Sequence, residues 1–275
     1  AADGVSSVLT RDAIGQFPDQ NVAESLRRLP GLNIMNDQGE GRFVSVRGLD
    51  PELNSTSLNG VRLPAPEADV RSVALDVISD IIESIEVKKS LTPDMDADTI
   101  GASVEIKTTS AFDRKKAYYS LNAEGSYNDY SGAVTPKAGL DFSTRLGENF
   151  GVAGGISFYK RKFETDNIET GGWDNENDVD YADTLEYRDY DVTRKRLSTA
   201  LSLDWRASDT TTAYVRGNYS QFDDHEYRRR TTFEFGDPSS GDENSAAFSD
   251  ADDTIEVQRD LKDRFERQRI RSVAI

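Results

Sequence analysis

The sequence predicts an α+β domain, followed by antiparallel strands of a transmembrane β-barrel that is incomplete, with about six strands. Three observations support this. The first part combines one helical apolar stripe with short β-type runs. The second part consists of segments of about ten residues in which apolar and polar side chains alternate. The connections between those segments alternate between short and long. We therefore expect two domains, residues 1–112 and 113–275.

A helix is predicted between Pro18 and Pro30. Asp19 is the expected N-cap, and Val22, Leu26 and Leu29 recur at helical spacing. Pro30 followed by glycine ends the pattern. The helix therefore presents one apolar face, which we expect to pack on a small sheet.

Short β-type runs make up the rest of the first domain. Asn59-Gly60 is a dipeptide typical of a two-residue hairpin turn. The predicted strands are Val5–Leu9, Leu32–Met35, Arg42–Gly48, Thr56–Leu58, Ser84–Lys88 and Ser103–Thr109. In the last of these, Val104 and Ile106 alternate with Glu105 and Lys107, the pattern of a half-buried strand.

Beyond Phe112 the alternation lengthens to about ten residues, as a barrel wall between lipid and water requires. The predicted wall strands are Ala117–Asn128, Val134–Ser143, Gly151–Phe163, Leu197–Ala207, Thr212–Phe222 and Arg264–Ile275. The connections at 146–150 and 208–211 are short. We expect long, acidic, aromatic-bearing loops at 164–188 and 223–262, all at the outer end.

Composition narrows the possible functions. The net charge of −17 argues against a nucleic-acid partner, which would need clustered Lys and Arg. There is no cysteine and only one histidine, so thiolate or multi-histidine metal sites and His-based triads are not expected. No run of eighteen apolar residues is present. We expect no enzymatic activity, no cofactor and no metal site.

Three stretches, 18–32, 39–60 and 81–108, carry a family resemblance. In this order and spacing they resemble the plug domain of TonB-dependent outer-membrane receptors, especially the carbohydrate-uptake branch known from Caulobacter-like bacteria. The resemblance implies a protein of the Gram-negative outer membrane, in contact with its lipid and driven by TonB with the inner-membrane ExbB-ExbD complex. The implied ligand is an oligosaccharide, with a siderophore or other iron chelate as the alternative.

The resemblance also implies functional residues. Arg47 matches a family arginine at the junction of plug and barrel, and Lys89 lies where a second one is expected. The implied ligand contacts at the plug tip are Asp50, Glu52, Asn54, Pro64 and Glu67.

Two aromatic side chains beyond residue 163 are further ligand candidates. Trp173 and Tyr181 offer flat faces on which a sugar ring can stack. Aromatic girdles at membrane interfaces account for Trp and Tyr equally well.

A plugged transporter needs about 22 strands, so six strands indicate a fragment that would not transport alone. A soluble β-rich adhesin or carbohydrate-binding module would show the same alternation of side chains and stays open as the rival. It differs in requiring that the apolar face be buried inside the protein.

Overall fold

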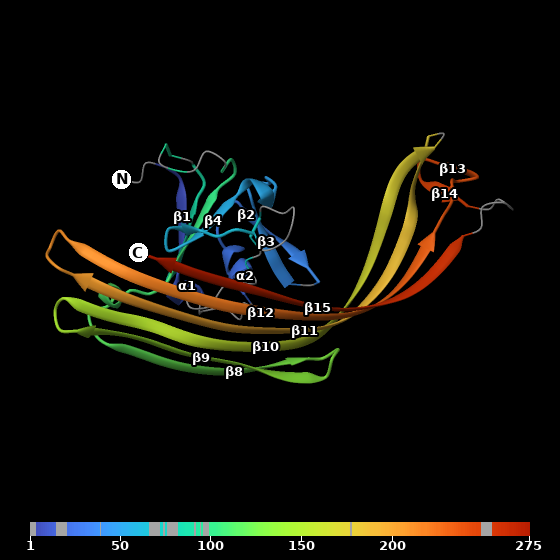
Figure 1. Ribbon diagram of the computed structural model, residues 1–275. Coiled ribbons are helices and arrows are strands. Elements are labelled where there is room, and N and C mark those ends of the chain that lie inside the picture. Colours follow the sequence, from blue (N-terminus) through green and yellow to red (C-terminus); the bar gives the residue numbers. More distant parts are fainter. Residues whose placement is uncertain are drawn as a thin grey trace.

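The protein is described by a computed structural model that covers residues 4–14, 21–38, 40–65, 72, 73, 75, 82–90, 92, 93, 95, 99–176, 178–248 and 255–275. Figure 1 shows an N-terminal domain lying on one face of a long, curved sheet. We call this sheet the wall, and it consists of β8, β9, β10, β11, β12 and β15. Both parts of the predicted fold class are therefore present.

The N-terminal domain contains two sheets and short helices. A five-stranded sheet has the order β1-β6-β7-β4-β5, in which only β4 and β7 are parallel, and β2 pairs with β3 as a separate hairpin. The helices are α1 (Arg11–Ile14), α2 (Val22–Leu26) and the 3-10 turns η1 (Pro51–Leu53) and η3 (Ala111–Asp113). The strands are β1 (Ser6–Thr10), β2 (Leu32–Asp37), β3 (Glu40–Val46), β4 (Ser55–Leu58), β5 (Val61–Arg62), β6 (Ser84–Lys88) and β7 (Ser103–Lys107). The predicted domain boundary at residue 112 falls within η3 and stays a prediction.

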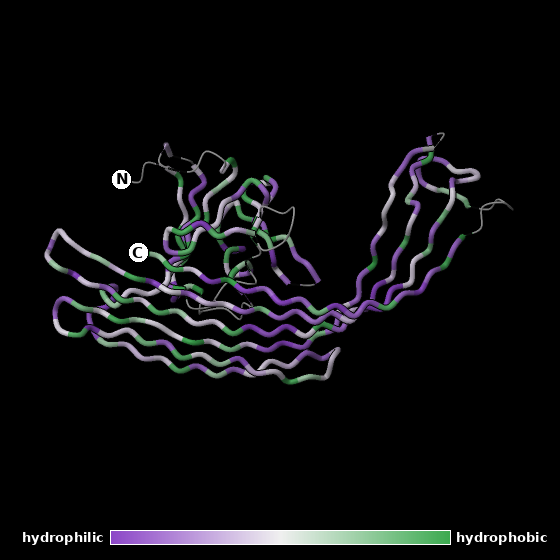
Figure 2. The backbone as a smooth tube through the Cα atoms, viewed as in Figure 1, coloured by the Kyte–Doolittle hydropathy of each residue, from purple (hydrophilic) through white to green (hydrophobic). Residues whose placement is uncertain are grey.

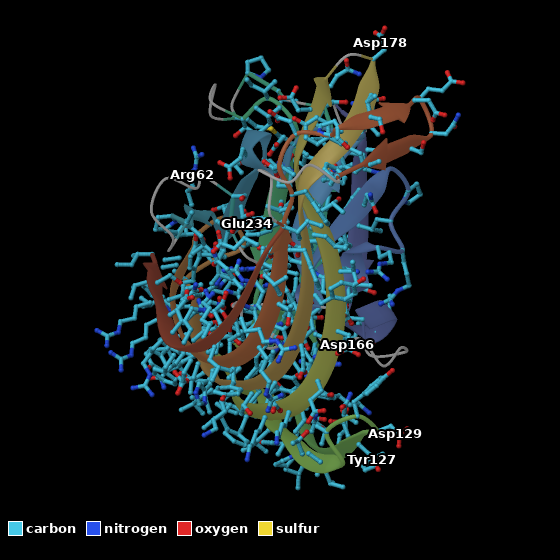
Figure 3. All side chains as sticks on the ribbon, turned by 90° about the vertical axis from the view of Figure 1, so that its right-hand side faces the viewer. Arg62, Tyr127, Asp129, Asp166, Asp178 and Glu234 are labelled. Atoms are coloured by element: carbon cyan, nitrogen blue, oxygen red, sulfur yellow. The ribbon has the colours of Figure 1, made fainter. Side chains whose placement is uncertain are left out.

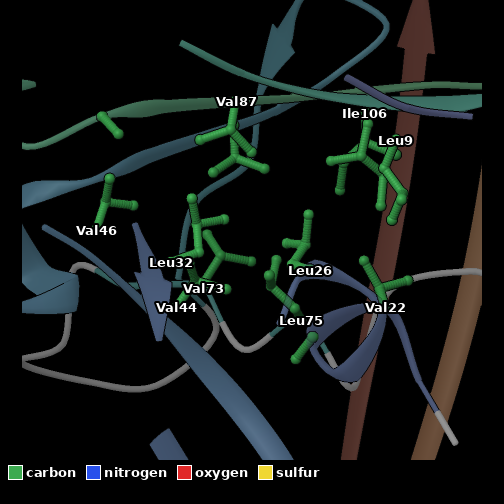
Figure 4. Packing of buried hydrophobic residues seen from close by; sticks show 14 of the residues in the cluster. Leu9, Val22, Leu26, Leu32, Val44, Val46, Val73, Leu75, Val87 and Ile106 are labelled. Atoms are coloured by element: carbon green, nitrogen blue, oxygen red, sulfur yellow. The ribbon is translucent and has the colours of Figure 1, made fainter. Parts of the chain in front are cut away.

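The core of this domain lies between α2, the β2–β3 hairpin and the five-stranded sheet (Figure 4). Leu26 of α2 is fully buried, as are Ile85 and Val87 on β6 and Ile106 on β7. The two-residue alternation of β6 and β7 points these side chains to one face. Burial of each contributes about 1.5–3 kcal/mol relative to exposure.

Helix α2 is shorter than predicted. Its N-cap is Asn21, whose side-chain oxygen accepts a hydrogen bond from the backbone N–H of Glu24 at 3.1 Å. The backbone then tightens, because Arg27 N–H bonds to the Glu24 carbonyl rather than continuing the α-helical ladder. The expected cap, Asp19, lies outside the described residues.

The predicted hairpin at Asn59-Gly60 is confirmed. Both residues have positive φ, 53° and 80°, as a type I′ turn between β4 and β5 requires. The side chain of Asn59 also accepts hydrogen bonds from the N–H and hydroxyl of Thr108, at 3.0 and 3.1 Å. The turn is therefore fixed to the segment that leaves β7.

Replacing Gly60 with alanine is expected to lower the free energy of unfolding by about 1–2 kcal/mol, because a Cβ is strained at this φ. Gly125→Ala is the matched control, since this strand glycine has no positive φ and its Cβ would meet nothing within 4 Å. Denaturant unfolding of the two variants measures the difference between their free energies of unfolding. Equal midpoints would contradict the assigned turn.

The wall is a six-stranded antiparallel sheet in which each strand pairs with the next along the chain, apart from the small β13–β14 hairpin. Its strands are β8 (Tyr118–Asn128), β9 (Ala133–Leu146), β10 (Phe150–Glu176), β11 (Val179–Arg206), β12 (Thr212–Glu234) and β15 (Glu256–Ala274). The hairpin strands are β13 (Ser240–Asp242) and β14 (Ser245–Ala247). Short turns link β9 to β10 and β11 to β12, as predicted.

The prediction of long loops at 164–188 and 223–262 is wrong over most of their length. β10 and β11 stay paired to Glu176 and Val179, and β12 pairs with β15 as far as Glu234 and Glu256. Figure 3 shows Asp178 at the tip of the β10–β11 hairpin. Strand pairing continues beyond the apolar segments because it needs only backbone hydrogen bonds.

One face of the wall is apolar and faces away from the N-terminal domain. Leu121, Leu140 and Leu203 are 81%, 45% and 46% exposed. In Figure 2, hydrophobic residues recur along the stretch of the wall that lies below the N-terminal domain in this view. No described sheet covers this face, as the rival soluble module would require. Among the described residues no helix is long and apolar enough to cross a membrane.

Candidate functional site

The turn of the β2–β3 hairpin brings a carboxylate of the N-terminal domain to the inner face of the wall. Glu40 is only 3% exposed and forms ion pairs with Arg161 of β10 and Arg194 of β11. Strand alternation explains the two arginines, since both lie on the face opposite the exposed Phe158 and Leu197. One buried carboxylate thus bridges two wall strands.

Arg194 extends this contact into a network. Its Nε donates to Asp224 at 3.0 Å and its Nη2 donates to Gln38 at 2.9 Å. Gln38 in turn donates to Glu226 at 2.7 Å. Glu226 lies 3.3 Å from Lys262 and 3.0 Å from Arg264. We call these eight residues the ion cluster: Gln38, Glu40, Arg161, Arg194, Asp224, Glu226, Lys262 and Arg264.

Aromatic rings support the ion cluster. The guanidinium carbons of Arg161 and Arg194 lie 4.5 and 5.4 Å from the ring centre of Phe163. Such contacts favour a cation over a ring face. Beside the cluster, Phe43 of β3 and Ile270 of β15 both pack against Phe222 of β12. The junction therefore combines a large polar cluster with a small apolar contact.

Two further polar contacts join the N-terminal domain to the wall. Arg11 of α1 pairs with Asp141 of β9 at 2.5 Å. Ser110, which caps η3, donates to Asp204 of β11 at 2.8 Å. Together with the ion cluster, these contacts attach the N-terminal domain to the four wall strands β9, β10, β11 and β12, and the cluster itself extends to β15.

The chemistry of the ion cluster favours attachment that can be released. It holds three carboxylates and four cations, so each charge has a partner of opposite sign. Removing one member of a buried pair costs about 3–5 kcal/mol, whereas separating the pair into water exposes only groups that water solvates well. An interface of this kind is destabilised by single substitutions, but it can open when water reaches both surfaces.

The predicted junction residues Arg47 and Lys89 are not members of the ion cluster. Lys89 is buried within the N-terminal domain, where its ammonium donates to the Ser7 hydroxyl at 2.8 Å and to the Pro30 carbonyl. Arg47 is exposed at φ 56°, and it forms no ion pair with the described wall strands. Lys89 therefore fastens the domain internally, and a contact of Arg47 with the barrel stays a prediction.

The predicted tip residues gather around η1. Asp50 caps η1 by accepting from the N–H of Glu52 at 2.9 Å, and Glu52 accepts from the Ser72 hydroxyl. Asn54 donates to the Val44 carbonyl at 2.8 Å. These three side chains thus have structural roles already. Pro64 is exposed beyond β5, and Glu67 lies outside the described residues.

The two predicted aromatic ligand residues differ in exposure. Trp173 is 68% exposed, with its indole N–H donating to Thr170 at 3.1 Å. Tyr181 is buried, bonds to Asp237 through its hydroxyl and packs edge-on against Phe248. Of the pair, Trp173 presents its ring to solvent.

No group of His, Cys, Asp or Glu in the described part of the chain has the arrangement of a metal site.

The comparison with protein families identifies the N-terminal domain. Residues 1–103 match the model described as the TonB-dependent receptor plug domain. The N-terminal domain is a TonB-dependent receptor plug domain. Receptors with this plug are proteins of the Gram-negative outer membrane, which is the location of this chain and agrees with the exposed apolar face of its wall.

Solved structures similar to this chain include two receptors and one transporter. The ferric enterobactin receptor PfeA of Pseudomonas aeruginosa, as its G324V mutant, has 13% identity and a TM-score of 0.49, and the match covers 93% of this chain and 45% of that one. The siderophore receptor PirA of Acinetobacter baumannii has 15% identity and a TM-score of 0.48, with 94% and 44% covered. The ferric citrate transporter FecA, without ligand, has 15% identity and a TM-score of 0.45, with 99% and 56% covered. The chain thus spans about half the length of these proteins.

The sequence analysis does not predict the ion cluster, although one sequence pattern indicates it. Arg161, Arg194 and Asp224 occupy positions whose two-residue alternation directs them away from lipid. A charged residue at such a position faces either water or another protein surface. Identifying Glu40 as the partner required the tertiary structure, because Glu40 lies 154 residues from Arg194 in the chain.

Proposed function

We propose that this chain supplies the plug and six wall strands of a TonB-dependent receptor that takes up an oligosaccharide across the outer membrane. The observation that carries the proposal is the buried ion cluster between plug and wall. Its charged groups can be rehydrated when the plug shifts, so a path can open without exposing a large apolar surface. In this account no covalent bond of the ligand changes, and the protein is not an enzyme.

Energy for the shift would come from the periplasm. TonB, with ExbB-ExbD in the inner membrane, would pull on the plug. The ion cluster, the Arg11–Asp141 pair and the Ser110–Asp204 hydrogen bond would resist this pull. Sustained force would break them in turn, because each is a separate local contact.

The oligosaccharide assignment rests on the plug resemblance and on Trp173. This indole lies near the outer tip of the β10–β11 hairpin, beside the exposed Asp174 and Asn175. An aromatic face beside hydrogen-bonding groups suits a sugar ring. The plug-tip residues Asp50, Glu52, Asn54, Pro64 and Glu67 would supply further ligand contacts, as the family resemblance implies.

Titration of the full-length receptor with maltooligosaccharides and chitooligosaccharides tests the ligand class. We expect binding of one series, weakened about tenfold by Trp173→Ala, since truncating an anchoring aromatic costs more than 1 kcal/mol. Trp205→Ala is the matched control, because this exposed indole stacks on Phe150 near the short-turn end of the wall. Binding of an iron chelate with no binding of either sugar series would replace the oligosaccharide with a siderophore-type ligand.

A further inference from the structure

The outward face of the wall, opposite the plug, carries a second apolar region beyond the segment that faces lipid. On β11 the apolar outward residues end at Leu197, and the outward residues from Lys195 to Asp189 are polar. Tyr187 follows them, about 33 Å along the strand from Leu197 at about 3.3 Å per residue. Lipid that contacts Leu197 therefore does not reach Tyr187.

This second region is a continuous row of side chains across four strands. Leu185 of β11, Phe233 of β12 and Val257 of β15 are direct cross-strand neighbours, and Ile168 of β10 is the neighbour of Tyr187. The rings of Tyr187 and Phe233 meet edge-on, with centres 6.0 Å apart. Ile168 and Tyr187 are 62% and 48% exposed. We call these five residues the outer patch: Ile168, Leu185, Tyr187, Phe233 and Val257.

The shape of the wall turns the outer patch away from the membrane. Figure 1 shows that the outer halves of β10, β11, β12 and β15 bend toward the side on which the plug lies. The outward face of these halves is the face opposite the plug, and the β13–β14 hairpin lies on it. The outer patch therefore points to the external medium.

The protein already uses the continuation of this face as a packing surface. Tyr181 of β11 and Phe235, which follows β12, belong to the same face nearer the tip. Phe248, which follows β14, stacks on Phe235 with ring centres 4.9 Å apart and meets Tyr181 edge-on. The outer patch continues this contact beyond the part that the hairpin covers.

Carboxylates flank the outer patch on the same face. Asp166 and Asp183 are exposed, and each lies two residues from a member of the patch. Arg229 of β12 is paired with Asp189 at 2.8 Å. The outward-facing charged residues that flank the patch are Glu164, Asp166, Asp183, Asp189 and Asp191, with Arg229 and Arg259 as the cations. This acidic surplus disfavours contact with an anionic lipid surface or with the same face of a second copy, and it suits a basic partner.

We propose that the outer patch is a docking surface for a partner protein whose contact surface combines apolar side chains with Lys or Arg. The apolar side chains cover Ile168 and Tyr187, and the cations pair with the flanking carboxylates. An exposed apolar patch with a polar rim is typical of a protein interaction site. Charge complementarity and continuity with the packing of the β13–β14 hairpin favour this occupant. The proposal does not depend on the ligand that is taken up.

The test uses the full-length receptor in bilayer discs of uncharged phospholipid and a short synthetic peptide of alternating leucine and lysine as the probe. Peptides of alternating serine and lysine, and of alternating leucine and glutamate, are the comparison ligands. We expect the leucine–lysine peptide to bind most tightly and to bind more weakly as salt is raised. Equal binding of either comparison peptide, or no binding of the leucine–lysine peptide, would overturn the proposal.

Substitutions locate the binding site of the peptide. Ile168→Ser combined with Tyr187→Ser should weaken binding at least about tenfold, since truncating an anchoring side chain costs more than 1 kcal/mol. Asp166→Asn combined with Asp183→Asn should weaken binding and reduce its salt dependence, and these exposed positions leave the fold intact. Tyr130→Ser is the matched control, because this tyrosine is 77% exposed in the turn between β8 and β9 and lies outside the patch. An equal loss in the control, or no loss in the patch variant, would contradict the assignment.

Cysteine labelling tests whether the outer patch is accessible in the complete receptor. Ile168→Cys and Tyr130→Cys should both react with a water-soluble maleimide, and the leucine–lysine peptide should protect only the first. If Ile168→Cys fails to react without peptide while Tyr130→Cys reacts, the receptor itself covers the patch and the proposal is wrong.

Discussion

Glu40→Gln is expected to detach the β2–β3 hairpin from the wall, lowering the free energy of its opening by about 3–5 kcal/mol. The glutamine has nearly the same shape but no charge. Arg161 and Arg194 would then remain buried beside a neutral amide, with Asp224 as the nearest remaining carboxylate of Arg194. The closed hairpin loses stability because two cations would stay desolvated without the anion that they share.

Amide hydrogen exchange in β2 and β3 of the full-length protein measures this opening. A loss of 3 kcal/mol or more raises exchange rates by about 100-fold or more. Asp37→Asn is the matched control: it removes a carboxylate from the same hairpin, but one whose pair with Arg42 at 2.7 Å is partly exposed. That change should cost only about 0–1 kcal/mol. Similar exchange rates in both variants would show that the ion cluster does not hold the hairpin.

Leu203→Arg is the substitution with the next largest expected effect. Leu203 lies on the outward face of β11, two residues from Trp205, within the apolar segment. A charged side chain facing lipid costs about 2–4 kcal/mol near the bilayer centre and less toward its edges. The full-length variant should therefore insert less stably into a bilayer.

Reversible unfolding of the full-length protein in phospholipid vesicles measures the difference in unfolding free energy between the variant and the unsubstituted protein. Thr193→Arg is the control, because Thr193 faces the same side of β11 but lies beyond Lys195, where the outward face is polar. It should change stability by less than about 1 kcal/mol. A Leu203 variant as stable as the Thr193 variant would mean that this face does not contact lipid.

Local patterns explain why the sequence predicted most elements. The two-residue alternation of Ile85 with Val87 and of Val104 with Ile106 specifies a buried face wherever these strands pair. Asn59 and Gly60 both have positive φ, which Asn and Gly tolerate better than other residues, so this dipeptide indicates the turn. These features depend on neighbouring residues alone, so they are visible before folding.

The predictions failed where local pattern and structure separate. The sequence predicts long loops at 164–188 and 223–262 because these stretches are acidic and bear aromatic residues. Most of these residues belong to β10, β11, β12 and β15, whose side chains pair across the sheet, as Arg229 does with Asp189 and Arg230 with Glu186, both at 2.8 Å. The hydropathy pattern shows where the apolar segment of a strand ends, but the strand itself continues beyond that point.

The helix and strands of the plug, the two-faced wall and the short turns can be predicted from the sequence, because each depends on side chains within a few residues of one another. The groups that join the plug to the wall could be identified only from the folded structure. Lys89 binds inside the plug, whereas Glu40 reaches Arg161 and Arg194. The physical reason is that a buried charge is stable only beside its partner, and folding alone brings together residues more than a hundred positions apart.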